Sequence, residues 1–257
     1  MSHHAHDEPH LPHGSIWPFW LANAMALFGL GMVFVDTTIL LLVAGFAAIA
    51  FVLTGWVRED IRWWRTNTGT GPGLAKAGTL LFISSEVFIF GALFSAYFTF
   101  QRLADHWPDV DVHLPVVKTG IFTLFLFASS ATIHKADGHL RRGEHKQFRT
   151  WWLLTIILGG VFLVGQVLEY RELLSHGLGL TSGQFMTSFY LITGTHGIHV
   201  AGGLIYLIIV YIRAVKGQFD EHRHAAPETA SIYWHFVDIV WVFVFTIFYI
   251  VPTYVLH

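Results

Sequence analysis

The sequence predicts an all-α integral membrane protein, built as a seven-helix bundle. Only 12% of its 257 residues are charged and 54% are hydrophobic, with a mean hydropathy of +0.54, whereas soluble domains carry about 25% charged residues. In addition, seven apolar segments are long enough to cross about 30 Å of hydrocarbon, which takes about 20 helical residues. These segments cover residues 15–34, 38–57, 77–102, 116–134, 150–170, 185–212 and 230–251.

The connections between these segments divide the chain into two groups of helices. Only Val35-Asp36-Thr37-Thr38 joins the first two segments, so we expect a tight antiparallel hairpin. The next connection is longer and ends in a Gly/Pro-rich run, which marks a break. We therefore expect a polar His-rich tail over residues 1–14, a two-helix transmembrane hairpin over 15–57, a cytoplasmic linker over 58–76 and a five-helix transmembrane bundle over 77–257.

Composition limits the chemistry of the chain. It has no cysteine, so it cannot form a disulfide, a thiolate metal site, an iron–sulfur cluster or a covalently attached c-type haem. A net charge of -2 argues against a nucleic-acid partner. Five of the 17 histidines lie in the N-terminal tail, where we expect adventitious rather than dedicated metal binding. That tail has no apolar core, so we do not expect a cleavable signal peptide.

The basic residues predict an orientation. Twelve of the 15 Lys and Arg residues fall in the connections after the second, fourth and sixth segments or at the entry to the seventh. By the positive-inside rule, the N-terminus is then cytoplasmic and the C-terminus is outside.

Glu86 is a carboxyl group inside the third segment, about nine residues from its cytoplasmic end and so roughly 13 Å deep. Because no basic residue shares its span, it must be protonated or hold a polar partner. Two interpretations stay open. Glu86 is either a proton-active or lipid-contacting acid, or a neutral side chain bonded to Ser84, Ser85 or a neighbouring helix.

Ionisable side chains also occur in pairs inside the last spans. His235 and Asp238 are three residues apart on one face of the seventh segment, and His196 and His199 share one face of the sixth. Charge facing lipid is costly, so these faces should turn to other helices, a bound lipid or water. The fifth segment ends with Gln166, Glu169, Tyr170 and Glu172. Glycines on the sixth should let a neighbouring helix approach closely: Gly194, Gly197, Gly202 and Gly203.

A metal centre is the competing interpretation of these residues. His196, His199, His235, Asp238 and a Glu could ligate two metal ions, as carboxylate and His side chains do in some helical bundles. However, no span contains the Glu-x-x-His motif of those sites, and the chain has no His-Glu-x-x-His motif, nucleophile elbow or phosphate loop. We therefore favour an interhelical hydrogen-bond network.

Five segments carry a resemblance to a known family. They are SIWPF at 15–19, LFISSEVFIFGALFSAYF at 81–98, LGGVFLVGQVLEYRE at 158–172, SFYLITGTHGIHVAGG at 188–203 and ASIYWHFVDIVWVFVF at 230–245. In this order and spacing, the chain resembles subunit III of the haem–copper cytochrome c oxidases. The resemblance implies a subunit of a proton-pumping oxidoreductase of aerobic electron transport in a prokaryotic plasma membrane.

That resemblance also implies partners and bound groups. Such a subunit is not itself catalytic, packs mainly against subunit I and also with subunit II, and leaves haem and copper to these partners. It supports proton uptake, lipid binding and the stability of the catalytic subunit. Its first two helices splay from the other five, and the V-shaped cleft between them holds phospholipids.

Residue by residue, the resemblance assigns no catalytic residue and no metal ligand. It assigns Trp56, Arg58, Arg62 and Glu86 to lipid binding. Its proton-active or buried polar positions are Glu86, Glu169, His196, His199, Glu228, His235 and Asp238. The chain departs from the family by reading WVR where WWR is frequent, and by ending in IVPTYVLH.

Three alternatives remain open. Two are the related third subunits of quinol oxidases and of nitric oxide reductase clusters. Seven spans favour the cytochrome c type, because the quinol type usually lacks the first two helices. The third is a self-contained membrane metalloenzyme built on His196, His199 and His235.

Overall fold

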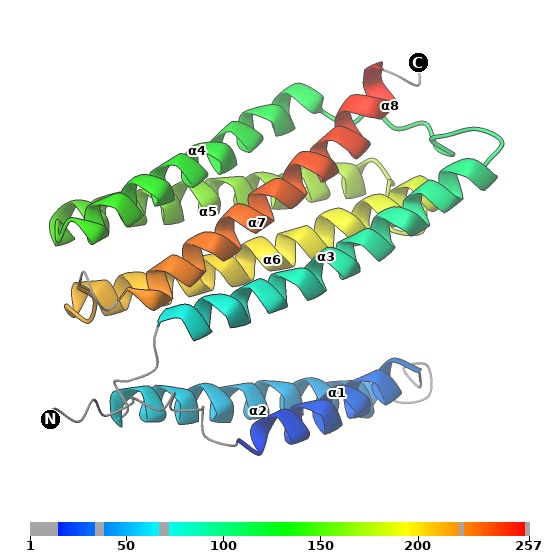
Figure 1. Cartoon of the computed structure of the whole chain (residues 1–257). Coiled ribbons are helices and arrows are strands. Elements are labelled where there is room, and N and C mark those ends of the chain that lie inside the picture. The colour runs from blue at the N-terminus through cyan, green and yellow to red at the C-terminus, as the bar shows by residue number, and fades with distance from the viewer. Residues whose placement is uncertain (1–14, 34–38, 67–71, 221–223, 255–257) are drawn as a thin grey trace, which may run out of the picture. The chain divides into compact units, whose positions relative to one another are not determined.

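The computed structural model describes residues 15–33, 39–66, 72–220 and 224–254, and within them all regular structure is helical. Figure 1 shows the long helices and the short elements that end the chain. They are α1 Trp17–Val33, α2 Ile39–Thr66, α3 Pro72–Leu103, α4 Val116–Arg141, α5 His145–Ser175, α6 Gln184–Val215, α7 Ala225–Phe245, the π-helical turn η1 Thr246–Ile250 and α8 Val251–Tyr254. The all-α prediction with seven long helices is confirmed.

Six regions of the described chain are long and apolar enough to cross a membrane: those in α2, α3, α4, α5 and α6, and one that runs from α7 to Thr253. The seventh long helix, α1, has 17 residues, slightly fewer than the roughly 20 that span hydrocarbon without tilt. The expected His-rich tail and the connection 35–38 lie outside the described residues.

Several helices extend beyond their apolar stretches. Helix α2 continues through Thr66 and α3 begins at Pro72, so most of the stretch 58–76, which the sequence suggested as a linker, is helical. Hydropathy alone therefore ends α2 too early, because its last turns carry Arg and Glu, which are good helix formers, and it begins α3 too late.

The chain divides into two compact units, Met1–Gly71 and Pro72–His257, and each is described by itself. In the first, α1 and α2 form a close antiparallel pair. A methyl group on Gly31 would meet the backbone nitrogen of Leu42 at 2.4 Å, and one on Gly45 would meet the Cα of Phe28 at 2.5 Å. Glycine at both positions lets the two backbones approach.

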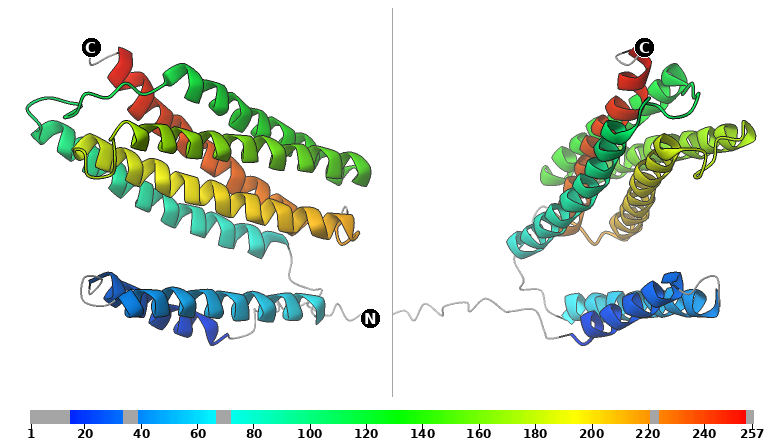
Figure 2. Two further views of the ribbon diagram at one scale, coloured as in Figure 1. Left: turned by 180° about the vertical axis from the view of Figure 1, so that it is seen from behind. Right: turned by 90° about the vertical axis from the view of Figure 1, so that its right-hand side faces the viewer.

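Helix α7 is central to the second unit. It packs against α3, α4 and α6, while α5 packs between α4 and α6; Figure 2 gives two further views of these helices. Half of the residues in the membrane window of α7 are buried, against 11% in α3. The fully buried indoles of Trp234 and Trp241 make α7 the core of this unit.

The glycines of α6 meet different surroundings. A methyl group on Gly203 would lie 2.9 Å from the indole of Trp234, whereas one on Gly197 or Gly202 would meet nothing within 4 Å. Only Gly203 of these three therefore permits a close helix contact within the described unit. The Trp234 Nε1 donates a hydrogen bond to Ser129 Oγ of α4 at 2.8 Å.

The π-helical turn η1 has a local cause. Pro252 has no backbone N–H and its ring would clash with the carbonyl group four residues earlier in an α-helix. The chain widens just before it, and the N–H of Val251 donates to the carbonyl of Thr246, five residues back. This wider turn carries Tyr249 into the core, where its side chain is fully buried.

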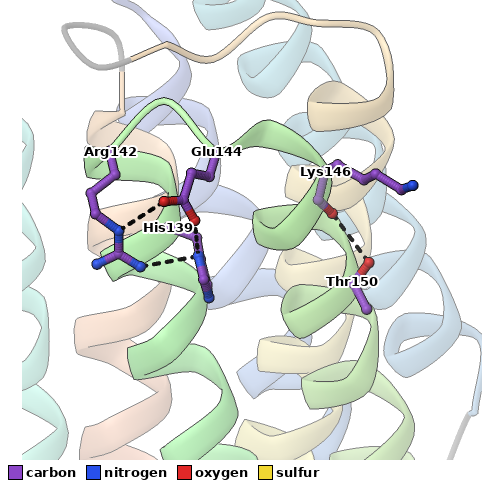
Figure 3. A network of polar contacts seen from close by, with 5 residues as sticks. All are labelled: His139, Arg142, Glu144, Lys146 and Thr150. Carbon is purple, nitrogen blue, oxygen red and sulfur yellow. Dashed lines mark hydrogen bonds and ion pairs between the residues drawn. The ribbon is translucent and has the colours of Figure 1, made fainter.

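Two polar turns order the ends of the five-helix unit. At the α4–α5 turn, Glu144 accepts hydrogen bonds from His139 Nδ1 at 2.5 Å and Arg142 Nε at 3.2 Å (Figure 3). At the other end, Asp109 accepts from the backbone N–H groups of Gln184 at 2.6 Å and Phe185 at 2.9 Å. Asp109 thereby caps the N-terminus of α6.

Candidate polar sites in the five-helix unit

Glu86 and His199 form a direct pair between α3 and α6. Glu86 Oε2 lies 2.8 Å from His199 Nε2, and both side chains are largely buried. Because α3 begins at Pro72, Glu86 lies near the middle of this helix. Ser84 and Ser85 bond the carbonyls of Leu80 and Phe82 instead. Of the predicted partners, the neighbouring helix is therefore the one that holds Glu86.

The hydrogen bonds of His199 limit where its protons lie. Its Nδ1 is 2.7 Å from the carbonyl oxygen of Thr195, which can only accept, so Nδ1 carries a proton. The contact between Nε2 and Glu86 then holds one further proton, either on the carboxyl group or on the imidazole. The pair is neutral overall in both forms, which lowers the cost of placing two ionisable groups inside a membrane.

His235 and Asp238 meet the same hydroxyl group. Ser130 of α4 donates to Asp238 Oδ2, and its Oγ lies 2.8 Å from His235 Nδ1. The hydroxyl has one proton to give, so Nδ1 of His235 donates to Ser130 while Ser130 donates to Asp238. Both α7 residues thus face α4. Ser130 thus lies between the histidine and the acid. In a nucleophile–base–acid triad, by contrast, the acid bonds the histidine directly.

His196 lies one turn before His199 but has different surroundings. Its ring is fully buried, 4.9 Å from the ring of Trp241 and 6.0 Å from that of Phe162. Neither of its ring nitrogens has a hydrogen-bond partner in the described part of the chain.

Glu169 is buried between α4 and α5. Its Oε2 accepts a hydrogen bond from Thr119 Oγ1 at 3.1 Å, and its Oε1 has no partner among the described residues. One turn further along α5, the exposed Glu172 forms an ion pair with Lys118.

Glu228 lies at a helix end rather than deep in the bundle. It occupies the first turn of α7, where a carboxylate complements the positive end of the helix dipole. Lys76 Nζ approaches it at 3.1 Å and Arg141 Nη2 at 3.6 Å. This carboxylate therefore ties together the ends of α3, α4 and α7.

Three of the four lipid-binding residues expected from the resemblance lie on α2, in the first unit, and the fourth, Glu86, lies on α3 in the second. Trp56 is half-buried, whereas Arg58 and Arg62 are exposed. The two arginines are four residues apart, so they share one face of the helix.

The placement of the histidines does not favour the metalloenzyme alternative. His199 pairs with Glu86 and His235 with Ser130, while His196 lies among aromatic rings. Across the residues that the structure describes, no three His, Cys, Asp or Glu side chains are placed to hold a metal ion.

Sequence reasoning missed the neutral partners of these groups. Ser130 and Thr119 lie in the apolar fourth segment, where their hydroxyl groups give little signal in the sequence. A pattern within one helix identifies a polar face, but it does not say which residue of another helix meets it.

Fold and sites together define a multi-spanning helical membrane protein in which several buried ionisable residues bond to side chains of neighbouring helices. The family model for cytochrome c oxidase subunit III matches residues 6–253. The chain belongs to this family, and it is therefore a membrane subunit of an oxidase complex.

Curated relatives agree with this assignment. The chain is 37% identical over 188 residues to the probable cytochrome c oxidase subunit 3 of Mycobacterium tuberculosis, which covers 73% of this chain and 93% of the relative. It is 36% identical over 184 residues to cytochrome c oxidase subunit 3 of Thermostichus vulcanus, covering 71% and 90%. A similar protein of Corynebacterium diphtheriae is 36% identical over 183 residues, covering 70% and 89%.

Proposed function

We propose that this chain is the non-catalytic subunit III of a proton-pumping haem–copper oxidase of the cytochrome c type. It supports proton uptake, lipid binding and the stability of the catalytic subunit, and its partner subunits hold haem and copper. The observation that carries this proposal is the Glu86–His199 pair, since both ionisable groups bond to each other across two helices.

The pair suits a supporting role in proton uptake. One proton lies between Glu86 Oε2 and His199 Nε2, and either group can carry it without changing the net charge of the pair. Such a group can hold a proton at membrane depth at lower cost than an isolated carboxylate. The other positions proposed as proton-active or buried polar are Glu169, His196, Glu228, His235 and Asp238.

Orientation and location form part of the proposal. The α4–α5 turn and the helix ends beside it carry Arg141, Arg142 and Lys146, which supports a cytoplasmic position for this end. The N-terminus is then cytoplasmic and the C-terminus outside, in a prokaryotic plasma membrane.

Lipids and subunits are the partners that the surface requires. Large apolar side chains are exposed on the second unit, among them Leu81, Phe88 and Ile198, and only lipid or another membrane subunit can cover them at low cost. Subunit I is the main proposed contact and subunit II a further one. Phospholipids bind at the first two helices, with Trp56, Arg58 and Arg62 near the head groups.

The cytochrome c type is preferred over the quinol oxidase and nitric oxide reductase alternatives because of the relatives' names. Alignment covers 93% of the mycobacterial relative but 73% of this chain, so that relative is shorter and still bears the cytochrome c name. The matches therefore support the donor type more strongly than the number of spans does.

Purification in mild detergent tests the proposal. The chain should co-purify with a larger haem-bearing membrane subunit, and the complex should reduce oxygen with cytochrome c as donor. Recovery of the chain only as a haem-free monomer, under conditions that keep other respiratory complexes intact, would contradict the subunit assignment. Preference for quinol would keep the subunit assignment and change the donor.

A further inference from the structure

Four buried polar side chains between α5, α6 and η1 have hydrogen-bonding atoms without partners among the described residues. These atoms are both side-chain ends of Gln166, Oε1 of Glu169, both ring nitrogens of His196 and the hydroxyl of Tyr249. None of the four residues is more than 5% exposed. They form a group that the paired sites around Glu86 and Ser130 do not include.

Three of these side chains are neighbours. Gln166 and Glu169 are three residues apart on α5, so they lie on the same face. The hydroxyl of Tyr249 lies near the carboxyl group of Glu169 and the amide of Gln166, close enough for their polar groups to interact. It does not meet the distance and angle of a direct hydrogen bond with either.

His196 lies beside this group. Helices α5 and α6 are antiparallel, and Tyr170 hydrogen-bonds Thr193 across them at 2.6 Å. Gln166 is one turn back from Tyr170 and His196 is about one turn on from Thr193, so the two lie at the same level. The indole of Trp241 lies near both His196 and Tyr249, at 4.9 and 6.3 Å.

A pocket reaches Glu169 from the surface. Its volume is about 360 Å³. The pocket lies at the end of the unit where the α3–α4 and α5–α6 connections are found. Its polar lining consists of Asp111, His113, Glu169, Glu172 and His176. Glu169 therefore belongs both to the pocket and to the buried group.

Leaving these buried polar atoms without any hydrogen-bond partner would destabilise the folded protein. Each buried polar atom without a partner loses the hydrogen bonds that it made to water in the unfolded chain, and this group holds six such atoms. The group contains both donors and acceptors: amide N–H, hydroxyl, imidazole and carboxyl. Water matches such a mixed set, and buried water commonly makes about three hydrogen bonds to otherwise unsatisfied groups.

We infer that α5, α6 and η1 enclose a water-binding site formed by Gln166, Glu169, His196 and Tyr249, and that its water exchanges with the aqueous phase through the pocket at Glu169. The site gives this subunit a hydrated interior reached from the end opposite Glu228 and the α4–α5 turn. It is separate from the Glu86–His199 pair on α3 and α6.

Radiolytic footprinting of the intact, detergent-purified protein tests the inference. Hydroxyl radicals formed from bound water oxidise the buried side chains beside it. Tyr97 is a matched control, because it is as buried as Tyr249 at 1% against 0% exposed but its hydroxyl already accepts from Trp107 Nε1 at 3.1 Å. Tyr249 should be oxidised severalfold faster than Tyr97. Equal rates would overturn the site.

Isotope exchange tests the route through the pocket. After rapid mixing into H₂¹⁸O, oxidised Tyr249 should carry ¹⁸O as soon as exposed side chains such as His113 do. Oxidation of Tyr249 that keeps ¹⁶O for minutes would overturn the connection to the pocket.

A conservative substitution of Tyr249 gives an independent test, because the direction of the change in the unfolding midpoint depends on whether the hydroxyl is hydrated. Tyr249→Phe should lower the unfolding midpoint if the hydroxyl is hydrated, because a satisfied hydrogen bond is lost. If the hydroxyl is dry and unpaired, the same substitution removes a desolvated group and should raise the midpoint, which would overturn the inference.

Discussion

Trp234 of α7 lies directly over Gly159 of α5: a methyl group added to Gly159 would come within 2.6 Å of the indole ring. The adjacent Gly160 meets nothing within 4 Å. Two neighbouring glycines in one helix therefore have opposite roles, and only Gly159 is needed for a helix contact inside the described unit.

Substitution of these glycines should separate packing from helix propensity. Gly159→Ala forces the fully buried indole to move and should destabilise the protein by about 1–3 kcal/mol, the usual cost of overpacking a core. Gly160→Ala should be neutral or stabilising by up to about 1 kcal/mol, because alanine favours helix. Midpoints of detergent-induced unfolding measure both, and an equal loss for the two variants would show that the Trp234 contact is not the cause.

The cap on α6 is supplied from outside the helix. Gly183 at the N-cap has no side chain to offer, and Asp109 bonds the first two N–H groups instead. Asp109→Ala should cost about 0.5–2 kcal/mol, the range for N-cap losses, and should speed amide exchange at Gln184 and Phe185. Asp111→Ala is the control, since Asp111 is almost fully exposed and forms an ion pair with the exposed His113 rather than a cap on α6. Unchanged exchange in Asp109→Ala would contradict the capping role.

The α4–α5 turn should be sensitive to acid. The hydrogen bond from His139 lowers the pKa of Glu144 below its usual range, with Arg142 as a further cause. A lowered pKa in the folded state means that the ionised carboxylate stabilises the turn above the ordinary carboxyl pKa of about 4.3. This stabilisation is lost as pH falls through the lowered value.

Amide exchange of the turn measures this effect. After correction for intrinsic rates, protection around residues 142–145 should fall between about pH 5 and pH 3 in the native chain. Glu144→Gln cannot titrate and should show lower protection with no such fall. The same acid loss in both proteins would assign the effect to another group.

Arg58 and Arg62 should retain phospholipid. They share an exposed face of α2, and guanidinium groups bind phosphate through paired hydrogen bonds. Replacing both with alanine should reduce the phosphorus content of the washed complex, whereas replacing both with lysine should preserve more of it. Equal phospholipid content in all three proteins would contradict the lipid role.

The sequence predicted the helices well because burial in a membrane imposes long apolar runs on each of them. It predicted their ends less well at α2, where charged residues continue the helix beyond the apolar stretch, and at α3, which begins at Pro72, five residues before the expected segment. Buried polar positions such as Glu86 and Asp238 were found for the same reason as the helices, since a charge in an apolar run is easily seen.

The partners of these positions could not be found in this way. Ser130 lies 108 residues from Asp238 and 105 from His235, and a serine in an apolar helix has little cost of its own. Which helix faces meet depends on the packing of α7 against α3, α4 and α6. That packing is decided by side-chain shapes, such as Trp234 against Gly203, rather than by a period in one helix.

Glu86→Gln tests the function assigned to the buried pair. In the native protein, Nδ1 of His199 is held by Thr195, so the neutral ring presents Nε2 as an acceptor. The amide of glutamine can donate to Nε2 and keep the link between α3 and α6, but it cannot exchange the proton. The variant should therefore assemble, whereas Glu86→Ala leaves Nε2 without this partner and should destabilise the unit by about 1–3 kcal/mol.

Activity then separates support from catalysis. The assembled Glu86→Gln complex should retain much of its oxygen-reducing activity, with defects in proton uptake or in how long activity lasts during turnover. Proton uptake is measured with a pH-indicator dye after a single turnover, and durability by the decay of oxygen consumption. Complete loss of oxygen reduction in a fully assembled Glu86→Gln complex would mean that this chain performs chemistry here assigned to its partner. Normal uptake and durability would instead make the pair a purely structural link between α3 and α6.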